Sequence, residues 1–369
     1  MNKWTKQLRA YDDSVDHNYD AKAPENCIYT ASPFINWIYA NKSMGIPKGT
    51  GTIFFSEPKS GKSLIIQAIV ERMHMEDKFL VETGKLKQEH RRHAVIFNSE
   101  MRGKFQSGLF KGIDPEFLTV FDTNRPEDIF DRIYTDFLPG LQESDPDEKF
   151  HLGLVAFDSI TSIGGTKSMD EDRSVNDHLI GDKALTITKG WEKVIPVLKR
   201  YCIPYFGVEQ MRKNIDAKNP YAPKEKMAGV FATKHAFEYF VSIKRAGAQD
   251  DKADIDGNEF TDESKKDARG YSDQTGHKIY FKMEQSSLGT AGRSGVLTID
   301  YSKGIINTHE EIFTLGLNTG VIKLAAQTYS FGDKAVRGKA NFANLVKDDP
   351  ALAAAILEEV RKLDDKDSL

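Results

Sequence analysis

An eight-residue segment in the first sixth of the chain has the residue types and spacing of a loop that binds phosphate groups. It reads Ser56-Glu57-Pro58-Lys59-Ser60-Gly61-Lys62-Ser63. The segment follows Thr52–Phe55, which is dense in β-forming residues, and runs into an apolar stretch of mixed helical spacing from about Lys62. In a strand–loop–helix unit of this kind, backbone N–H groups face the phosphates, the lysine reaches the β- and γ-phosphates, and the serine ligates Mg²⁺. The segment therefore predicts a nucleoside triphosphate site with Lys62 on the phosphates and Ser63 on the metal.

The first position of this loop departs from the usual G-x-x-x-x-G-K-[ST] pattern, because Ser56 stands where glycine is expected. We expect the turn at Ser56 to avoid a positive φ angle or to carry a steric cost. The alternative interpretation is an ordinary loop followed by a Lys-Ser dipeptide.

A carboxylate ends the most apolar strand that follows the loop, since Asp158 comes directly after Leu152–Phe157. At the carboxyl end of such a strand, it would lie across the crevice from the phosphate loop. There it can hold a water of the Mg²⁺ shell and orient Ser63, which is the Walker B arrangement. The alternative is an aspartate that caps the next turn.

Two more strand ends carry polar groups suited to phosphoanhydride hydrolysis. Glu100 follows the strand-like run Ala94–Asn98 and can orient the attacking water as a base, with an exposed carboxylate as the alternative. Gln210 follows Tyr205–Val208, and its amide can bond a γ-phosphate and respond to its loss.

The composition limits the class of protein. The chain has 369 residues, a formal net charge of −4 and a pI of about 6.2, so a polyanion site must come from a local basic cluster. Cys27 and Cys202 offer neither a disulfide framework nor zinc spacing, and the N-terminus lacks the apolar core of a signal peptide. No apolar stretch approaches the roughly 18 residues that span a bilayer. We therefore expect a cytoplasmic protein with no membrane partner.

The strand ends that carry these groups need a sheet to bring them together. Strand-like runs alternate with helical patterns early in the chain, which predicts an α/β fold with a mainly parallel, doubly wound sheet flanked by helices. The later runs lie at Phe117–Phe121, Phe240–Lys244 and Lys278–Met283, and a helix is expected at Pro350–Leu363.

Three polar stretches interrupt this alternation. Thr166–Asp182 and Met211–Thr233 are loop candidates. We interpret Gly247–Gly276 as an exposed hairpin excursion or a partly disordered insertion.

Taken together, these motifs resemble the RecA family of strand-exchange recombinases over nearly the whole chain. Beyond the phosphate loop, the resemblance lies in Ile28–Ser32, Gly45–Gly49, Asn98–Glu100, Glu209–Lys213, Gly338–Asn341 and Leu345–Pro350. The last two segments are similar to the small C-terminal domain of bacterial RecA, which generic ATPases of this fold lack. Ser56 and the divergence elsewhere look more like the phage branch, the UvsX-like recombinases.

The resemblance implies three parts of the chain. These are an N-terminal helix and linker for subunit packing at 1–27, a twisted RecA-like P-loop ATPase core at 28–308, and a small C-terminal α/β domain with an acidic end at 309–369. It also implies ATP and Mg²⁺ as cofactors, Glu100 as the catalytic glutamate and Gln210 as the γ-phosphate sensor. The family often places an aromatic residue near the adenine; the aligned position here is Ser107, and Phe105 is the nearest aromatic residue.

By the same resemblance, Thr166–Asp182 falls at the first DNA-binding loop and Met211–Thr233 at the second. The basic residues of the second loop are Arg212, Lys213, Lys218, Lys224 and Lys226. This local positive charge suits a phosphate backbone, and Tyr221 and Phe231 could stack on bases, whereas a solvated charged loop is the alternative. Acidic residues outnumber Lys167 and Arg173 in the first loop. Contacts between this loop and DNA would therefore have to come from those two side chains or from backbone amides.

In the RecA family, ATP lies between protomers and basic residues of the next subunit reach its γ-phosphate. Lys282 matches one such position, and the second falls on Glu284 or Gln285. The stretch Lys3–Asp12 matches the helix that packs on the adjacent subunit, although an amphipathic helix on its own core is the alternative.

The resemblance implies an ATP-dependent DNA recombinase that forms helical filaments on single-stranded DNA and pairs it with a homologous duplex in a bacterial or phage-infected cell. Single-strand-binding and mediator proteins are the implied accessory partners. Two alternatives stay open, namely a hexameric DnaB-like helicase and a RecA-like paralogue that coats or anneals strands without turnover.

Overall fold

The computed structural model describes residues 24–39, 44–58, 60–101, 110–170, 181–213, 225–227, 231–245, 275–287 and 289–366. Some sequence predictions fall outside these ranges. They concern the helix at Lys3–Asp12, most of Gly247–Gly276, and the residues Lys59, Phe105, Ser107, Arg173, Lys218, Tyr221 and Lys224.

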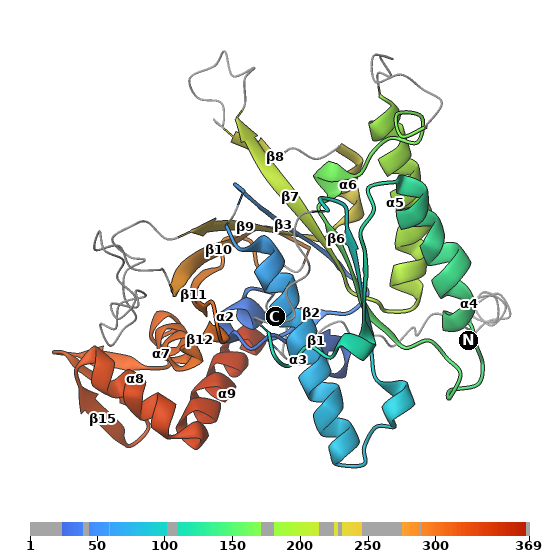
Figure 1. The fold of residues 1–369 in the computed structure, drawn as a ribbon. Coiled ribbons are helices and arrows are strands. Elements are labelled where there is room, and N and C mark those ends of the chain that lie inside the picture. The colour runs from blue at the N-terminus through green and yellow to red at the C-terminus, as the bar shows by residue number, and fades with distance from the viewer. Residues whose placement is uncertain are drawn as a thin grey trace, which may run out of the picture.

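A mixed, mainly parallel sheet forms the centre of the molecule, with strand order β12-β11-β10-β9-β3-β7-β6-β4-β5 (Figure 1). The parallel part comprises β9 (Tyr239–Arg245), β3 (Gly51–Ser56), β7 (Tyr205–Lys213), β6 (Leu152–Asp158), β4 (His93–Asn98) and β5 (Leu118–Phe121). The antiparallel edge comprises β10 (Gly276–Ser286), β11 (Ser294–Asp300) and β12 (Gly304–Ile306). The predicted α/β fold is confirmed. At the antiparallel edge, β10 matches the expected run Lys278–Met283, whereas β11 and β12 were not predicted.

Helices cover both faces of the parallel part. Phe54 packs in one apolar cluster with α3 (Lys62–Glu82), whereas its neighbour Ile53 packs in another with α5 (Asp182–Arg200). Successive strand residues point to opposite faces, so β3 serves two cores. The strand β6 is buried on both faces, which explains its continuous apolar sequence.

The segment Met211–Thr233 is not simply a loop, so that prediction is wrong in the described parts. The strand β7 continues to Lys213 and pairs antiparallel with β8 (Glu225–Met227), and α6 (Phe231–Ala236) begins inside the stretch. Polar residues continue the strand because β8 satisfies their backbone groups.

Shorter elements complete the core. They are η1 (Pro24–Asn26), β1 (Cys27–Ile28), α2 (Pro33–Ile38), β2 (Ile46–Pro47), η2 (Gln88–His90), η3 (Pro115–Phe117), η4 (Glu127–Asp131), η5 (Ile133–Phe137), α4 (Leu138–Leu141) and η6 (Ile160–Ser162). The helix α2 begins where Ser32 accepts a hydrogen bond from the Ile35 N–H at 3.1 Å and Pro33 supplies the first turn.

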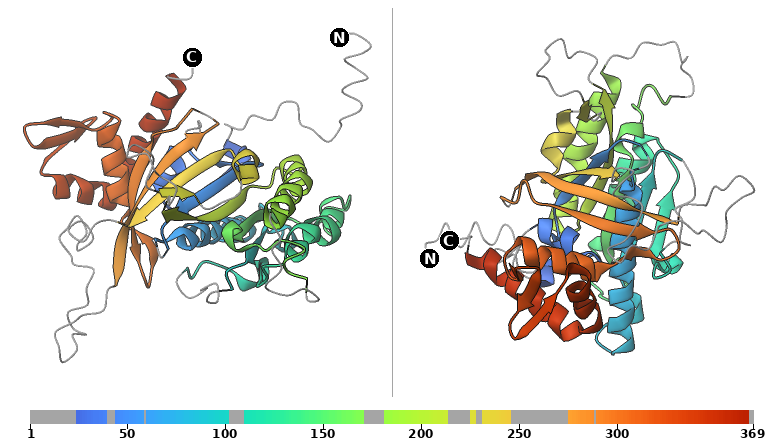
Figure 2. Two further views of the ribbon diagram at one scale, coloured as in Figure 1. Left: turned by 90° about the horizontal axis from the view of Figure 1, so that it is seen from above. Right: turned by 90° about the vertical axis from the view of Figure 1, so that its left-hand side faces the viewer.

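A small α/β region follows the main sheet. It comprises α7 (Thr308–Asn318), the antiparallel strands β13 (Lys323–Ala325), β14 (Thr328–Phe331) and β15 (Lys334–Arg337), and the helices α8 (Lys339–Asp348) and α9 (Pro350–Lys366). The predicted helix at Pro350–Leu363 is confirmed by α9. Figure 2 shows this region in orange and red, at the opposite end of the molecule from α4 and α5. Within the described ranges, no helix is both long and apolar enough to cross a bilayer.

Candidate functional site

The phosphate loop leaves the carboxyl end of β3 and enters α3. Gly61 precedes α3 with a φ of 92°, and a Cβ there would lie 2.4 Å from Ile279 Cδ1. Glycine avoids both the strained φ and the clash. Ser56 ends β3 without a positive φ, so the first of the two options expected for this turn holds.

The Lys62 ammonium lies against the inside of this loop. Its Nζ donates to Ser56 Oγ at 2.7 Å and to the Glu57 carbonyl at 2.9 Å. Ser60 Oγ donates to the same carbonyl at 2.8 Å. The loop thus holds a cation where the predicted site needs one for the β- and γ-phosphates.

Asp158 faces the loop from the carboxyl end of β6. Its Oδ2 accepts a hydrogen bond of 2.5 Å from Ser63 Oγ, at the start of α3. This contact joins the two residues that the sequence assigned to the metal. Among the described residues, no cluster of three or more histidine, cysteine, aspartate or glutamate side chains could hold a metal ion. Ser63, water held by Asp158 and phosphate oxygens could supply the ligands of a magnesium ion here.

Glu100 and Gln210 meet beside this pair. The Glu100 Oε1 atom accepts hydrogen bonds from Gln210 Nε2 at 2.5 Å and from Ser159 Oγ at 2.9 Å. Glu100 follows β4 and Gln210 lies in β7, so the contact spans β6, which lies between them. The carboxyl ends of parallel strands meet at one edge of a sheet, and this edge collects both side chains.

One pocket of about 440 Å³ gathers the predicted nucleotide residues. Its lining comprises Pro58, Ser60, Gly61, Lys62, Ser63, Leu64, Glu100, Asp158, Val208, Gln210, His277 and Tyr301. The structure thus brings together five of the residues assigned to catalysis or metal binding.

Two aromatic residues of this pocket were missed by the sequence reasoning. The rings of His277 and Tyr301 have centroids 5.4 Å apart, and the Tyr301 ring is partly exposed. An exposed ring at the pocket wall offers a surface on which a purine can stack. No spacing signal links the two positions; they meet because β10 pairs with β11, with His277 opposite Ile299.

Burial makes the opposite charges of this pocket costly. Burial raises the pKa of Asp158, although the hydrogen bond from Ser63 acts in the other direction. Burial also lowers the pKa of Lys62, although the attraction of Asp158 and Glu100 acts in the other direction. A magnesium–nucleotide complex would bring a cation to the first and phosphate charge to the second. The donor set therefore fits such a complex.

Lys282 lies apart from this pocket, on the exposed face of β10. Its Nζ lies 2.8 Å from Glu284 Oε2, and Ser242 Oγ donates to the other oxygen of Glu284 at 2.8 Å. The pairing of β10 with β9 shifts register between Met283 and Gln285, so Glu284 is the extra residue of a bulge. Partial burial alone would raise the pKa of Glu284, but the hydrogen bonds and the charge of Lys282 lower it overall.

The described parts of the predicted DNA loops lie at the edge of the sheet formed by the carboxyl ends of the parallel strands. The backbones of Arg212 and Lys213 extend β7, Lys226 lies in β8, and Lys167 is exposed after η6. Arg212 and Lys213 therefore lie two and three residues after Gln210 on the same strand.

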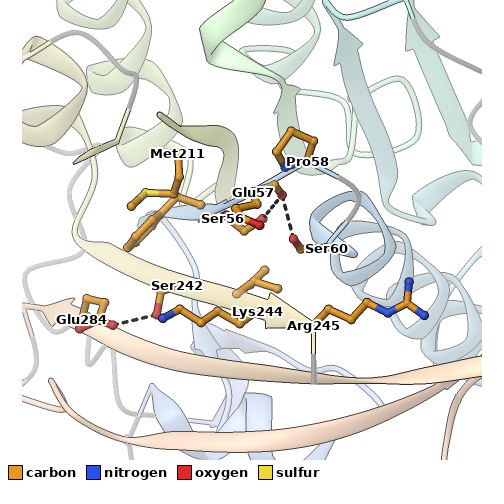
Figure 3. Close-up of a pocket in the computed structure, with 11 residues that line it drawn as sticks. Ser56, Glu57, Pro58, Ser60, Met211, Ser242, Lys244, Arg245 and Glu284 are labelled. Atoms are coloured by element: carbon orange, nitrogen blue, oxygen red, sulfur yellow. Dashed lines mark hydrogen bonds between the residues drawn. The ribbon is translucent and has the colours of Figure 1, made fainter. Parts of the chain in front are cut away.

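A second pocket, of about 570 Å³, opens on the other side of the phosphate loop (Figure 3). Its lining includes Glu57 and Pro58 of the loop, Met211 of β7, and Lys244 and Arg245 at the end of β9. Because β9 runs parallel to β3, its last residues reach the edge that holds the phosphate loop. The sequence reasoning missed these two cations. The sequence signal that could have found them was the pair Lys244-Arg245 at the end of the strand-like run Phe240–Lys244.

No protein-family model matches the chain. Its sequence is 25% identical over 219 residues to Protein RecA of Psychrobacter cryohalolentis, across 58% of this chain and 55% of that protein. It is also 25% identical over 211 residues to Protein RecA of Psychrobacter arcticus, across 57% of this chain and 53% of that protein. The chain spans about half the length of the curated relatives it matches. It is therefore a distant homologue of RecA proteins, and these comparisons give no support to the phage branch in particular.

Proposed function

We propose that this chain is a DNA-dependent ATPase of the RecA family, which forms helical filaments on single-stranded DNA and catalyses homologous pairing and strand exchange. The observation that carries the proposal is the single pocket formed by Lys62, Ser63, Glu100, Asp158 and Gln210. The distant homology to RecA proteins supports it. Membership of the phage branch stays a prediction that depends on Ser56 and on the divergence elsewhere in the chain.

Each pocket residue has a role that its position supports. Lys62 would neutralise the β- and γ-phosphates, and Asp158 would orient Ser63. Glu100 would take a proton from the attacking water, and Gln210 would leave Glu100 to bond the γ-phosphate. The bound magnesium would withdraw charge from the reacting phosphate.

Single-stranded DNA would bind along the edge that continues from this pocket. Lys244 and Arg245 supply cations beside Met211, where the predicted second DNA loop begins. Arg212, Lys213, Lys218, Lys224, Lys226, Lys167 and Arg173 remain proposed DNA contacts. In this arrangement the γ-phosphate contact of Gln210 lies two residues before the first of these cations, so nucleotide binding can order the DNA-binding segment.

Two observations favour this function over its alternatives. The region from α7 to α9 follows the core in the manner of the RecA resemblance, which argues against a DnaB-like helicase. Glu100 lies against Gln210 in the nucleotide pocket, which argues against a paralogue that binds strands without turnover. Electron micrographs with single-stranded DNA separate the helicase alternative, because closed rings would contradict continuous helical filaments.

The proposal is tested by Lys62→Ala. We expect loss of hydrolysis together with loss of ATP-dependent DNA affinity, because no other lining residue supplies a cation inside the loop. Phosphate release is measured with and without single-stranded DNA, and strand exchange is measured beside it. The control is Lys78→Ala, an exposed lysine on the same helix. Undiminished turnover of the Lys62 variant would refute the phosphate-loop assignment.

A further inference from the structure

A single hydroxyl links the strand that carries Gln210 to the turn that follows β6. Thr161 lies in η6, and its Oγ1 accepts a hydrogen bond of 3.4 Å from the Gln210 backbone N–H. The same oxygen donates its proton to Glu209 Oε2. A threonine hydroxyl has one proton to donate, and here it goes to a carboxylate.

Glu209 is a buried carboxylate that the proposed reaction does not use. Its side chain is 0% exposed, and it does not line the nucleotide pocket. Residues 209 and 210 are neighbours in β7, so their side chains point to opposite faces of the sheet. Gln210 faces Glu100, whereas Glu209 holds Thr161. Burying a carboxylate is costly unless it is hydrogen-bonded, and the Thr161 hydroxyl supplies such a bond to Glu209.

Thr161 also contacts the start of α5. Its carbonyl oxygen accepts a hydrogen bond from Lys183 Nζ. Lys183 is the second residue of α5, which follows the predicted first DNA loop. Thr161 therefore touches the nucleotide sensor on one side and the far end of that loop on the other.

The two ends of the predicted loop are tied to each other as well. The Asp182 carboxylate accepts hydrogen bonds from the backbone N–H groups of Lys167 at 3.3 Å and Ser168 at 2.9 Å. A Cβ on Gly165 would lie 2.2 Å from Asp182 Oδ2, so a side chain there would break this approach. Because Asp182 precedes Lys183 in the chain, a movement of Lys183 would also move Asp182, and with it Lys167 and Ser168, whose N–H groups bond to Asp182.

We propose that Thr161 and Glu209 are positioning residues that couple the γ-phosphate sensor Gln210 to the two described ends of the predicted first DNA loop, at 166–170 and 181–182. The inference depends on the proposed function, because it names a regulator of the same site. The contact between the Gln210 N–H and Thr161 is at the long limit of hydrogen bonding, so a small shift of the backbone at Gln210 strengthens or breaks it. When the Gln210 amide changes partner from Glu100 to a phosphate, its backbone moves and Thr161 follows.

The experiment uses Thr161→Val, which keeps the shape of the side chain and removes the hydroxyl. The rescue variant is Thr161→Ser. The matched control is Thr188→Val, since Thr188 is half-buried on α5 and its hydroxyl donates to the Ala184 carbonyl within its own helix. Each protein is assayed for ATPγS affinity, for basal hydrolysis and for hydrolysis stimulated by single-stranded DNA. Hydrogen exchange of the peptide 162–170 is measured with and without Mg-ATPγS.

In Thr161→Val we expect nucleotide affinity and basal hydrolysis within about twofold of wild type, and DNA stimulation reduced about five- to tenfold, the loss expected for one or two hydrogen bonds. The nucleotide-dependent change in exchange of 162–170 should disappear in this variant and return in Thr161→Ser. Should the valine variant fold poorly, Thr161→Val combined with Glu209→Gln, which removes the buried charge left without its donor, replaces it in the same assays.

Three results would overturn the coupling. They are an equal fall of basal and stimulated rates, unchanged stimulation, and an exchange change in 162–170 that persists without the hydroxyl. Normal ATPγS binding by wild type with no exchange change in that peptide overturns this inference alone. A wild-type protein that binds no ATPγS overturns the proposed function together with it.

Discussion

Two hydrogen-bond donors hold the Glu100 side chain, and both can also donate to a neutral carbonyl oxygen. Ser159 Oγ and Gln210 Nε2 both donate to Oε1, and a glutamine carbonyl can accept the same two bonds. Glu100→Gln should therefore keep the position of the side chain and lose its basicity. We expect turnover to fall by about a hundredfold, with ATP affinity nearly unchanged and filaments that persist.

Steady-state phosphate release and nucleotide titration measure the two effects of Glu100→Gln separately. The control is Glu116→Gln, an exposed glutamate after β4. Filaments that disassemble as fast as those of wild type would argue against a catalytic role for Glu100.

The residues of the nucleotide pocket differ in how well the sequence predicted them. Glu100, Asp158 and Gln210 were predictable because each lies at the carboxyl end of an apolar strand, and parallel strands bring such ends together. His277 and Tyr301 were not predictable, because their meeting depends on the pairing of β10 with β11. The alternation of apolar and polar residues along the chain shows where strands end. The order of the strands in the sheet depends on tertiary contacts and cannot be predicted from that alternation.

At the scale of elements, β9 ends in two cations beside the phosphate loop. Replacing Lys244 and Arg245 by alanine should weaken single-strand binding and flatten the log–log salt dependence by about 0.7 per lost phosphate contact. Fluorescence anisotropy of a labelled oligonucleotide across a salt series measures the slope. Replacement of Arg212 and Lys213 should have a similar effect.

The control for this pair is the double alanine variant of Lys323 and Lys334, which are exposed on β13 and β15. A slope equal to that of wild type in the β9 variant would mean that the two cations are only a solvated face.

The contact between α2 and α7 makes stability depend on pH. Glu311 is buried, and burial raises its pKa to about 8, although hydrogen bonds from Ser32 Oγ and the Phe34 N–H act in the other direction. The folded protein therefore holds a proton that the unfolded chain releases above the ordinary pKa of 4.5. This group makes the free energy of unfolding decrease as pH rises from about 4.5 to 8, by at most about 1.4 kcal/mol per pH unit.

Glu311→Gln removes this proton and should flatten the decrease between pH 5 and pH 8, measured by urea unfolding. Glu82→Gln, at the exposed end of α3, is the control and should keep the wild-type profile. A Glu311→Gln profile parallel to that of wild type would exclude Glu311 as the cause.

The elements themselves were largely predictable where the chain alternates between strand and helix. The strands from β3 to β7, β9 and β10 were expected from apolar runs, and α9 from its helical spacing. The extension of β7 and its pairing with β8 were not, since Arg212 and Lys213 are polar and become strand residues only through a partner. The chain's division at 1–27, 28–308 and 309–369 stays a prediction.

At the scale of the whole molecule, Lys282 lies outside the pocket that holds Lys62 and Glu100. If ATP is shared between subunits, Lys282→Ala should bind nucleotide as a monomer and lose DNA-stimulated hydrolysis. Mixing it with Glu100→Gln should restore part of the activity, because some interfaces then pair an intact Glu100 with an intact Lys282. The readout is phosphate release over a range of mixing ratios.

The control for this mixture is each variant alone at the same total concentration. No recovery in filaments shown to contain both proteins would favour an ATPase that is complete within one chain.

Two helices of the C-terminal region also belong to the main core. In α7, Phe313 packs in the C-terminal cluster and Leu315 in the main one, and in α9 the residues Ile356 and Val360 divide in the same way. A region joined to its neighbour by one stretch of chain can swing, whereas two helices with shared buried faces resist rotation. A force applied to the C-terminal region would thus twist the central sheet instead of bending the chain between the two.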